Sequence, residues 1–224
     1  MSKLYWRGEG ETSDEPVDEG HPLPAKLFGA NWGAGNALLG SPFTADLLWK
    51  LAVQGRLFIS SDADFNDLVT GTTTLANTTP TFLLDVPAGA VALPLFLNLV
   101  QTGTVAGGDI DLIIEIDKVK RYSTGGTSEK IYSPMAVGIG PLSKFYTLPT
   151  AVAGYGVRLV GVDIAADVSP AEGAIQGPFW KPEMPYFLPG PASFLVFTNA
   201  GTTGPSWFWS FGWAEFRTDE ITGS

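Results

Sequence analysis

The stretch WFWSFGWAEF, Trp207 to Phe216, lies near the end of the chain and alternates large aromatic side chains with mostly small ones. The odd positions hold Trp207, Trp209, Phe211 and Trp213, and the even positions hold Phe208, Ser210, Gly212 and Ala214. Successive side chains of a β-strand point to opposite faces of the sheet, so this period of two predicts a strand with one aromatic face. Such a face suits the core of a β-sandwich, a subunit interface or a platform on which sugars stack.

The core interpretation of this aromatic strand is favoured. If all four aromatics were exposed, they would form a large apolar patch, which on a soluble protein usually marks an interface. In a sandwich core the small residues would leave the other face of the strand smooth, so that a neighbouring subunit or loop could approach closely. An interface lined by the aromatics themselves and a sugar platform remain open alternatives.

The rest of the chain has the composition of an all-β protein. Its 224 residues are 45% hydrophobic and 16% charged, with 27 Gly and 17 Pro, which indicates many short strands joined by turns. About eight to ten strands are expected after Arg56, without the alternation of helices that marks a parallel sheet. An antiparallel β-sandwich of jelly-roll type is therefore predicted, with an immunoglobulin-like sandwich as the alternative.

The clearest alternation is DIDLIIEIDKV, residues 109–119. Its even positions from Ile110 to Ile116 are aliphatic, and four odd positions are acidic: Asp109, Asp111, Glu115 and Asp117. This pattern predicts a strand with one buried and one solvated face. Paired carboxylates could also serve glycoside hydrolysis, but a solvated face is the favoured interpretation.

The first part of the chain is predicted to be an arm. Residues 1 to about 24 are polar and mostly acidic, so they cannot bury enough apolar surface to fold alone. Tyr5 and Trp6 near its tip are candidates for docking on another surface. We expect residues 1–55 to form this N-terminal arm and residues 56–224 to form the sandwich.

One helix is predicted within the arm, over about residues 42–54. In SPFTADLLWKLAVQG, Ser41 fits the N-cap, Pro42 the first helical position and Gly55 the residue just past the end. The predicted apolar stripe consists of Phe43, Leu47, Leu48 and Leu51.

Charge and composition exclude several partners. The net charge is −10, and the densest basic group is Lys118, Lys120 and Arg121, so direct contact with nucleic acid or an anionic membrane surface is disfavoured. The chain has no cysteine for disulfides or thiolate metal sites. The N-terminal segment lacks the apolar region of a signal peptide, which favours a soluble protein without an export signal.

No catalytic residue, metal ligand or cofactor is predicted. His21 is the one histidine and lies in the acidic arm, whereas a cupin metal site normally needs several histidines and nucleophilic catalysis needs a positioned base. The acidic run DADFND, with Asp62, Asp64 and Asp67, departs from the calcium-loop pattern at Asp67 and at Thr73. A turn cluster is favoured there, and calcium binding stays an open alternative.

Two longer phrases resemble jelly-roll structural proteins from tailed-phage particles. They are LLGSPFTADLLWKLAVQGRLFIS and TPTFLLDVPAGAVALPLFLNLVQTGTVAGG, within about residues 28–120. The resemblance implies a head decoration (cement) protein or a minor capsid component, which is often trimeric and not an enzyme. It carries over no catalytic residue.

The acidic arm refines this expectation. Capsid proteins that package nucleic acid often carry a basic arm, so an acidic one favours the outer capsid surface of a virion and contacts with other capsid proteins. We expect a homotrimer made in the host cytoplasm, with no nucleic-acid or membrane partner. The alternatives are a carbohydrate- or receptor-binding module of a head or tail fibre, and a jelly-roll protein that forms the shell itself. The candidate interface residues are Tyr5, Trp6, Trp207, Trp209, Phe211 and Trp213.

Overall fold

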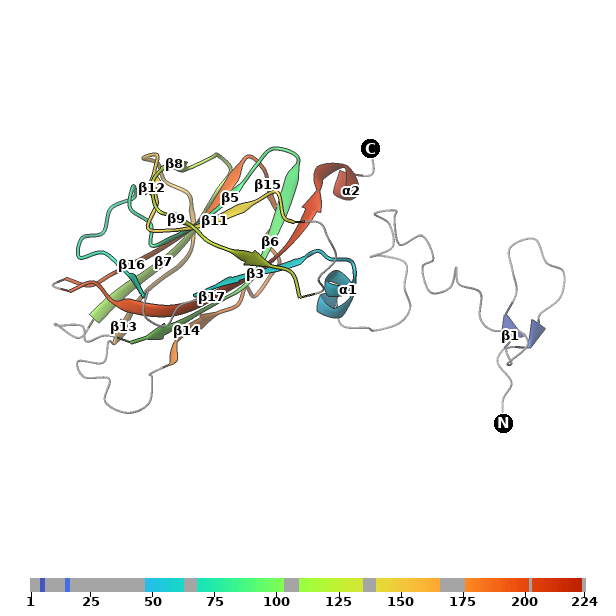
Figure 1. Ribbon diagram of the computed structural model, residues 1–224, viewed down its shortest axis with the longest axis horizontal. Helices are drawn as coiled ribbons and strands as arrows, with labels where there is room; N and C mark the ends of the chain where they lie inside the picture. Colours follow the sequence, from blue (N-terminus) through green and yellow to red (C-terminus); the bar gives the residue numbers. More distant parts are fainter. Residues whose placement is uncertain are drawn as a thin grey trace.

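The protein is a sandwich of two antiparallel β-sheets (Figure 1). The computed structural model describes residues 5–6, 15–16, 47–62, 68–102, 109–134, 140–165, 176–201 and 203–222. None of the helices in these ranges is long and apolar enough to cross a membrane.

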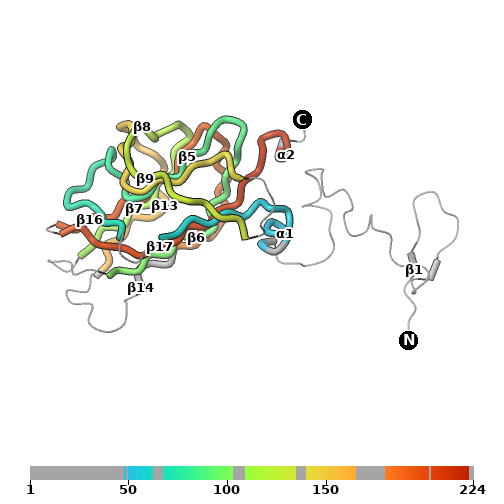
Figure 2. The backbone as a smooth tube through the Cα atoms, viewed as in Figure 1, coloured from blue at the N-terminus to red at the C-terminus, as the bar shows by residue number. Residues whose placement is uncertain are grey.

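The first sheet is built around the last long strand, β17. Its order is β10 (Ile131–Tyr132), β3 (Leu57–Ser61), β17 (Ser206–Arg217), β6 (Ala90–Gln101) and β14 (Gln176–Trp180). Two short strands extend it, β4 (Val69–Thr70) beside β17 and β15 (Leu188–Pro189) beside β6. The first and last long strands of the sandwich, β3 and β17, therefore lie side by side (Figure 2).

The second sheet is built around β7 and β16. Its order is β13 (Val157–Ala165), β7 (Asp109–Asp117), β16 (Ala192–Asn199), β5 (Phe82–Val86), β11 (Lys144–Thr147) and β9 (Thr127–Ser128). Two further pairs stand apart from the large sheets: β8 (Tyr122–Thr124) with β12 (Thr150–Ala151), and β1 (Tyr5–Trp6) with β2 (Glu15–Pro16).

The connectivity of the eight principal strands is that of a jelly roll. In chain order these strands are β3, β5, β6, β7, β13, β14, β16 and β17. One sheet pairs the first, eighth, third and sixth of them, and the other pairs the second, seventh, fourth and fifth. Two interlocked Greek keys produce this order, so the predicted jelly-roll sandwich is confirmed.

The aromatic face of β17 fills the core between the sheets. Trp207, Trp209, Phe211 and Trp213 are each no more than 4% exposed. Phe145, from β11 of the opposite sheet, lies with its ring centroid 5.2 Å from that of Trp209 and 5.0 Å from that of Phe211. The core interpretation is therefore confirmed. The alternative predictions, a subunit interface or a sugar platform made of these four side chains, are wrong, because the sandwich itself buries them.

Helix α1 (Leu47–Val53) ends where the sequence predicted. Gly55 has a φ of 67°, its N–H donates to the carbonyl of Ala52, and the N–H of Arg56 donates to the carbonyl of Leu51. This is a Schellman motif, which favours glycine because of the positive φ. The predicted apolar stripe is only partly right: Leu51 is fully buried, but Leu48 is 41% exposed. Ser41, Pro42 and Phe43 lie outside the described residues.

Some elements of the fold were not predicted, among them a sheet-edge strand and a second helix. Strand β14 occupies the edge of the first sheet, and a short helix, α2 (Thr218–Thr222), follows β17. The ends of both helices lie at the same end of the sandwich (Figure 1). Arg56, just after α1, donates hydrogen bonds from both guanidinium amino groups to the carboxylate of Glu220 in α2.

Candidate functional site

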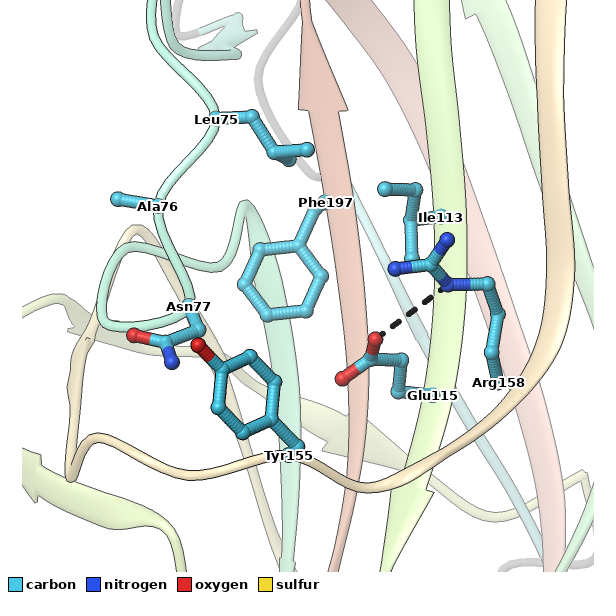
Figure 3. A pocket seen from close by; sticks show the side chains of 8 residues that line it. All are labelled: Leu75, Ala76, Asn77, Ile113, Glu115, Tyr155, Arg158 and Phe197. Atoms are coloured by element: carbon cyan, nitrogen blue, oxygen red, sulfur yellow. Dashed lines mark ion pairs between the residues drawn. The ribbon is translucent and has the colours of Figure 1, made fainter.

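A pocket opens on the outer face of the second sheet (Figure 3). It has a volume of about 310 Å³. Strands β7 and β16 supply its floor, residues 75–77 of the loop after β4 form one wall, and Tyr155 and Arg158 lie opposite. We call it the outer-face pocket.

The floor of the outer-face pocket is apolar. Ile113 of β7 and Phe197 of β16 face each other in register, and they are 8% and 4% exposed. Both point away from the main core because their neighbours Ile114 and Val196 point into it. They belong to a second apolar cluster on the outside of the sheet, which gives the pocket a fixed base.

The polar wall of the pocket is an ion pair across two strands. Glu115 of β7 and Arg158 of β13 are partners in the strand register, and Arg158 Nε lies 3.6 Å from Glu115 Oε1. The glutamate side chain is 9% exposed and the arginine side chain 59% exposed. The carboxylate therefore lies deep in the pocket while the guanidinium reaches its rim (Figure 3).

Tyr155 stands at the mouth of the pocket and is 88% exposed. It lies in the loop before β13, and the residues on either side fix that loop. The Asn77 side-chain amide donates to the carbonyl of Gly154 at 3.1 Å. At Gly156 a Cβ atom would collide with the carbonyl of Ile116, so only glycine lets the backbone pass this close to β7.

A buried arginine holds both walls in place. Arg121 is 1% exposed, and its guanidinium donates to the carbonyl of Val152 at 2.6 Å and to the carbonyl of Asn77 at 2.9 Å. A third bond, at 3.0 Å, reaches Asp117 at the end of β7. The loop that carries Tyr155 and the loop that carries Asn77 are thus tied to one charged group. The pocket is organised before any ligand arrives.

The solvated acidic face predicted for β7 is partly wrong. Asp109 is exposed, but Asp111 accepts a hydrogen bond from the Asn199 amide at 2.6 Å and Asp117 is paired with Arg121. Glu115 is only 7% exposed. The reason is that residues from distant loops and strands cover this face, which the local alternation cannot reveal. No pair of carboxylates converges in the pocket, since Glu115 is the one acid among its lining residues.

Beyond the pocket, the same face carries an acidic pair. Asp163 of β13 faces Asp111 of β7 in register. The pKa of Asp163 is raised, first by a hydrogen bond shared with Asp111, then by the negative charges of Asp111 and Asp109. Among the described residues no group of three side chains is arranged to hold a metal ion.

None of the other residues singled out in the sequence is among the described residues that line this pocket. The backbone of Tyr5 and Trp6 pairs with Glu15 and Pro16. His21, Asp64 and Asp67 lie outside the described residues. Asp62 is described, and its N–H donates to the carbonyl of Trp209 at 3.1 Å, which places it at the end of β3. Of the pocket residues, Glu115 belongs to the acidic alternation of β7, whereas no sequence pattern predicted Tyr155 or Arg158 as site residues.

Comparison with protein-family models, with curated proteins and with solved structures found no match.

Proposed function

We propose that this protein is a non-enzymatic virion structural protein of the tailed-phage type, a decoration (cement) protein that binds the outer surface of an assembled capsid as a homotrimer. The jelly roll supports this class because capsid proteins, lectins and cupins are its main users. The cupin use requires several histidine ligands, and this chain has a single histidine.

The observation that carries the proposal is a set of exposed apolar side chains at the end of the sandwich where α1 and α2 lie (Figure 1). Phe216, at the end of β17, is packed beneath Arg56, whose Cζ lies 5.5 Å from the ring centroid, and beside Phe187 at 6.4 Å. Three exposed apolar side chains belong to this end of the sandwich: Leu48 on α1, Phe187 beside Phe216 and Ile221 on α2, which are 41%, 52% and 46% exposed. Apolar groups gathered at one place mark a contact surface. We call these three residues the apolar end.

The position of the apolar end fits attachment to other protein subunits. The chain enters the sandwich here from the acidic N-terminal segment, so a surface contact and an arm contact would adjoin one another. The net charge of −10 favours protein partners over the phosphate backbone of packaged nucleic acid. Arg56 and Arg121 are in addition held by carboxylates of the same chain.

The oligomeric state tests the proposal. Light scattering after gel filtration should give three times the 23.8 kDa of one chain. The double variant Phe187→Ser, Ile221→Ser should be monomeric, because it removes two side chains of the apolar end that the fold leaves exposed. Val162→Ser, with a similarly exposed valine on β13, is the matched control and should remain trimeric.

Attachment to a capsid is tested separately. Purified tailed-phage particles that contain this chain should yield cross-links between it and another capsid protein. A stable monomer that also fails to sediment with such particles would contradict the proposal.

A further inference from the structure

We propose that the outer-face pocket binds a neutral sugar, one ring of a larger glycan. This inference does not depend on the virion proposal, because the pocket lies on the second sheet and shares no residue with the apolar end.

The size and shape of the pocket suit one ring. A volume of about 310 Å³ lies at the lower end of the range of small-molecule sites. The mouth at Tyr155 is open to solvent, so neighbouring units of a glycan could extend outward. A chain of sugars would not fit inside, and a ligand much smaller than a ring would leave the apolar floor uncovered.

The apolar parts of the pocket match the C–H face of a sugar ring. Phe197 and Ile113 form a flat base, and Tyr155 presents an aromatic ring at the mouth. An aromatic side chain that is 88% exposed buries little of its own surface, so it adds little to the stability of the fold. Yet its loop is held by the Asn77 amide and by the glycine at 156. An exposed ring on a fixed backbone is suited to stacking against a ligand.

The polar wall matches the hydroxyl groups. A carboxylate only accepts hydrogen bonds and a guanidinium only donates them, whereas each sugar hydroxyl can do both. Glu115 and Arg158 lie side by side, so adjacent hydroxyls of one ring could engage both. The two charges cancel. An anionic ligand would be repelled by the carboxylate, and a cationic ligand would be repelled by the guanidinium. The pair therefore favours a neutral ligand rich in hydroxyl groups.

The Arg121 network lowers the cost of binding. Its guanidinium fixes the carbonyls of Asn77 and Val152, which lie in the two loops beside the pocket. Loops that are already ordered lose little conformational freedom when a ligand arrives. Weak ligands such as single sugars depend on this, since they offer few contacts to offset an ordering cost.

Saturation-transfer NMR on the full chain tests the proposal with defined probes: D-glucose, D-galactose, D-mannose, N-acetyl-D-glucosamine and, as a charged comparison, N-acetylneuraminic acid. At least one neutral probe should bind with a dissociation constant on the order of 1 mM. Tyr155→Ala should weaken that binding about tenfold, while Tyr155→Phe should keep it because the ring remains. Glu115→Gln should also weaken it, because one of the two acceptor oxygens is replaced by a donor NH2 group.

Tyr132→Ala is the matched control, since Tyr132 is an exposed tyrosine on the first sheet, 43% exposed, and its removal should leave sugar binding unchanged. Urea midpoints of the two tyrosine-to-alanine variants that equal the midpoint of the unchanged protein would show that folding is intact. The proposal is overturned if no neutral probe binds at about 50 mM, if binding survives Tyr155→Ala undiminished, or if only the charged sugar binds.

Discussion

The two outer faces of the sandwich are covered in different ways. On the first sheet, Leu51 of α1 packs in an apolar cluster with Val91, Leu93, Ala214 and Phe216, and it is fully buried there. On the second sheet, loops from distant parts of the chain are held over β7 and β16 by a buried guanidinium. An apolar cover packs tightly because every additional contact contributes dispersion energy and buries apolar surface. A polar cover must satisfy particular donors and acceptors, and it leaves space between them.

This difference assigns different roles to the two faces. The apolar face contributes to stability. Through Phe216 it adjoins the apolar end, where the chain would meet other proteins. The polar face holds side chains at fixed positions around a pocket, which recognition requires. Variants on each face should therefore fail in different ways.

The largest effect is expected for Arg121→Ala on the polar face. The change leaves the partly buried Asp117 without its cation and leaves the carbonyls of Val152 and Asn77 without their donor. Breaking a buried ion pair by removing one partner costs about 3–5 kcal/mol, so the free energy of unfolding should fall by that amount. Urea denaturation followed by tryptophan fluorescence measures it.

Lys118→Ala is the control for Arg121, because it removes an exposed cation three residues away. Its effect should stay within about 0.5 kcal/mol. Equal losses for the two variants would mean that the Arg121 network does not hold the second face together.

A smaller loss, about 2 kcal/mol, is expected for Leu51→Ala on the apolar face. Leu51 is fully buried against β6 and β17, but it anchors a short helix at the surface, which can shift to fill part of the cavity. Hydrogen exchange should show faster opening of α1 with little change in β7 and β16. Leu48→Ala, on the same helix but 41% exposed, should change the stability by less than about 0.5 kcal/mol.

The inner faces of the strands could be predicted from the sequence, and the covers of the outer faces could not. Alternation with a period of two is local, so β7 and β17 were predicted together with their core residues. The partners that cover β7 are far away in the chain: Arg121 reaches Asn77 across 44 residues and Ser193 across 72. Nothing in the sequence around Glu115 indicates that Arg158 will stand beside it.

Local composition also hid elements that the structure contains. Strand β14 includes Gly177 and Pro178, two residue types that are disfavoured inside strands. It forms the edge of the first sheet, where the missing N–H of a proline is tolerated. The sequence GYGVRLVGVDIA, residues 154–165, also predicts a strand, which would include Tyr155, but β13 begins at Val157. Gly156 passes close to β7, and the residue before it is left outside the strand, at the mouth of the pocket.

Glu220→Gln should have a modest effect that depends on pH. Arg56 donates to Glu220 through two amino groups, and this hydrogen bonding lowers the pKa of Glu220 below 4.5. A lowered pKa contributes stability that is present above pH 4.5 and is lost as the pH falls through the folded-state value. The variant should lose about 0.5–1 kcal/mol at pH 7 and match the wild type in acid.

Urea midpoints measured between pH 3 and pH 7 test this expectation for Glu220. Asp219→Asn, at the exposed position just before it, is the control and should not change the pH dependence. A loss that is the same at every pH would show that the side chain of Glu220 packs on Arg56 without any contribution from its charge.

The smallest effect is expected for Asp163→Asn, and it should have the opposite sign. The pKa of Asp163 is raised because its protonated form shares a hydrogen bond with Asp111, and because Asp111 and Asp109 repel its charge. A raised pKa contributes stability that is fully present below pH 3.8 and is lost as the pH rises through the folded-state value. At pH 7 the wild type therefore carries an unrelieved repulsion on its polar face, and the asparagine variant should have a slightly higher urea midpoint. Near pH 3 the two proteins should agree. A lower midpoint at pH 7 would mean that the charge of Asp163 is attracted to a cation on this face, and that the polar cover is balanced more completely than the acidic pair indicates.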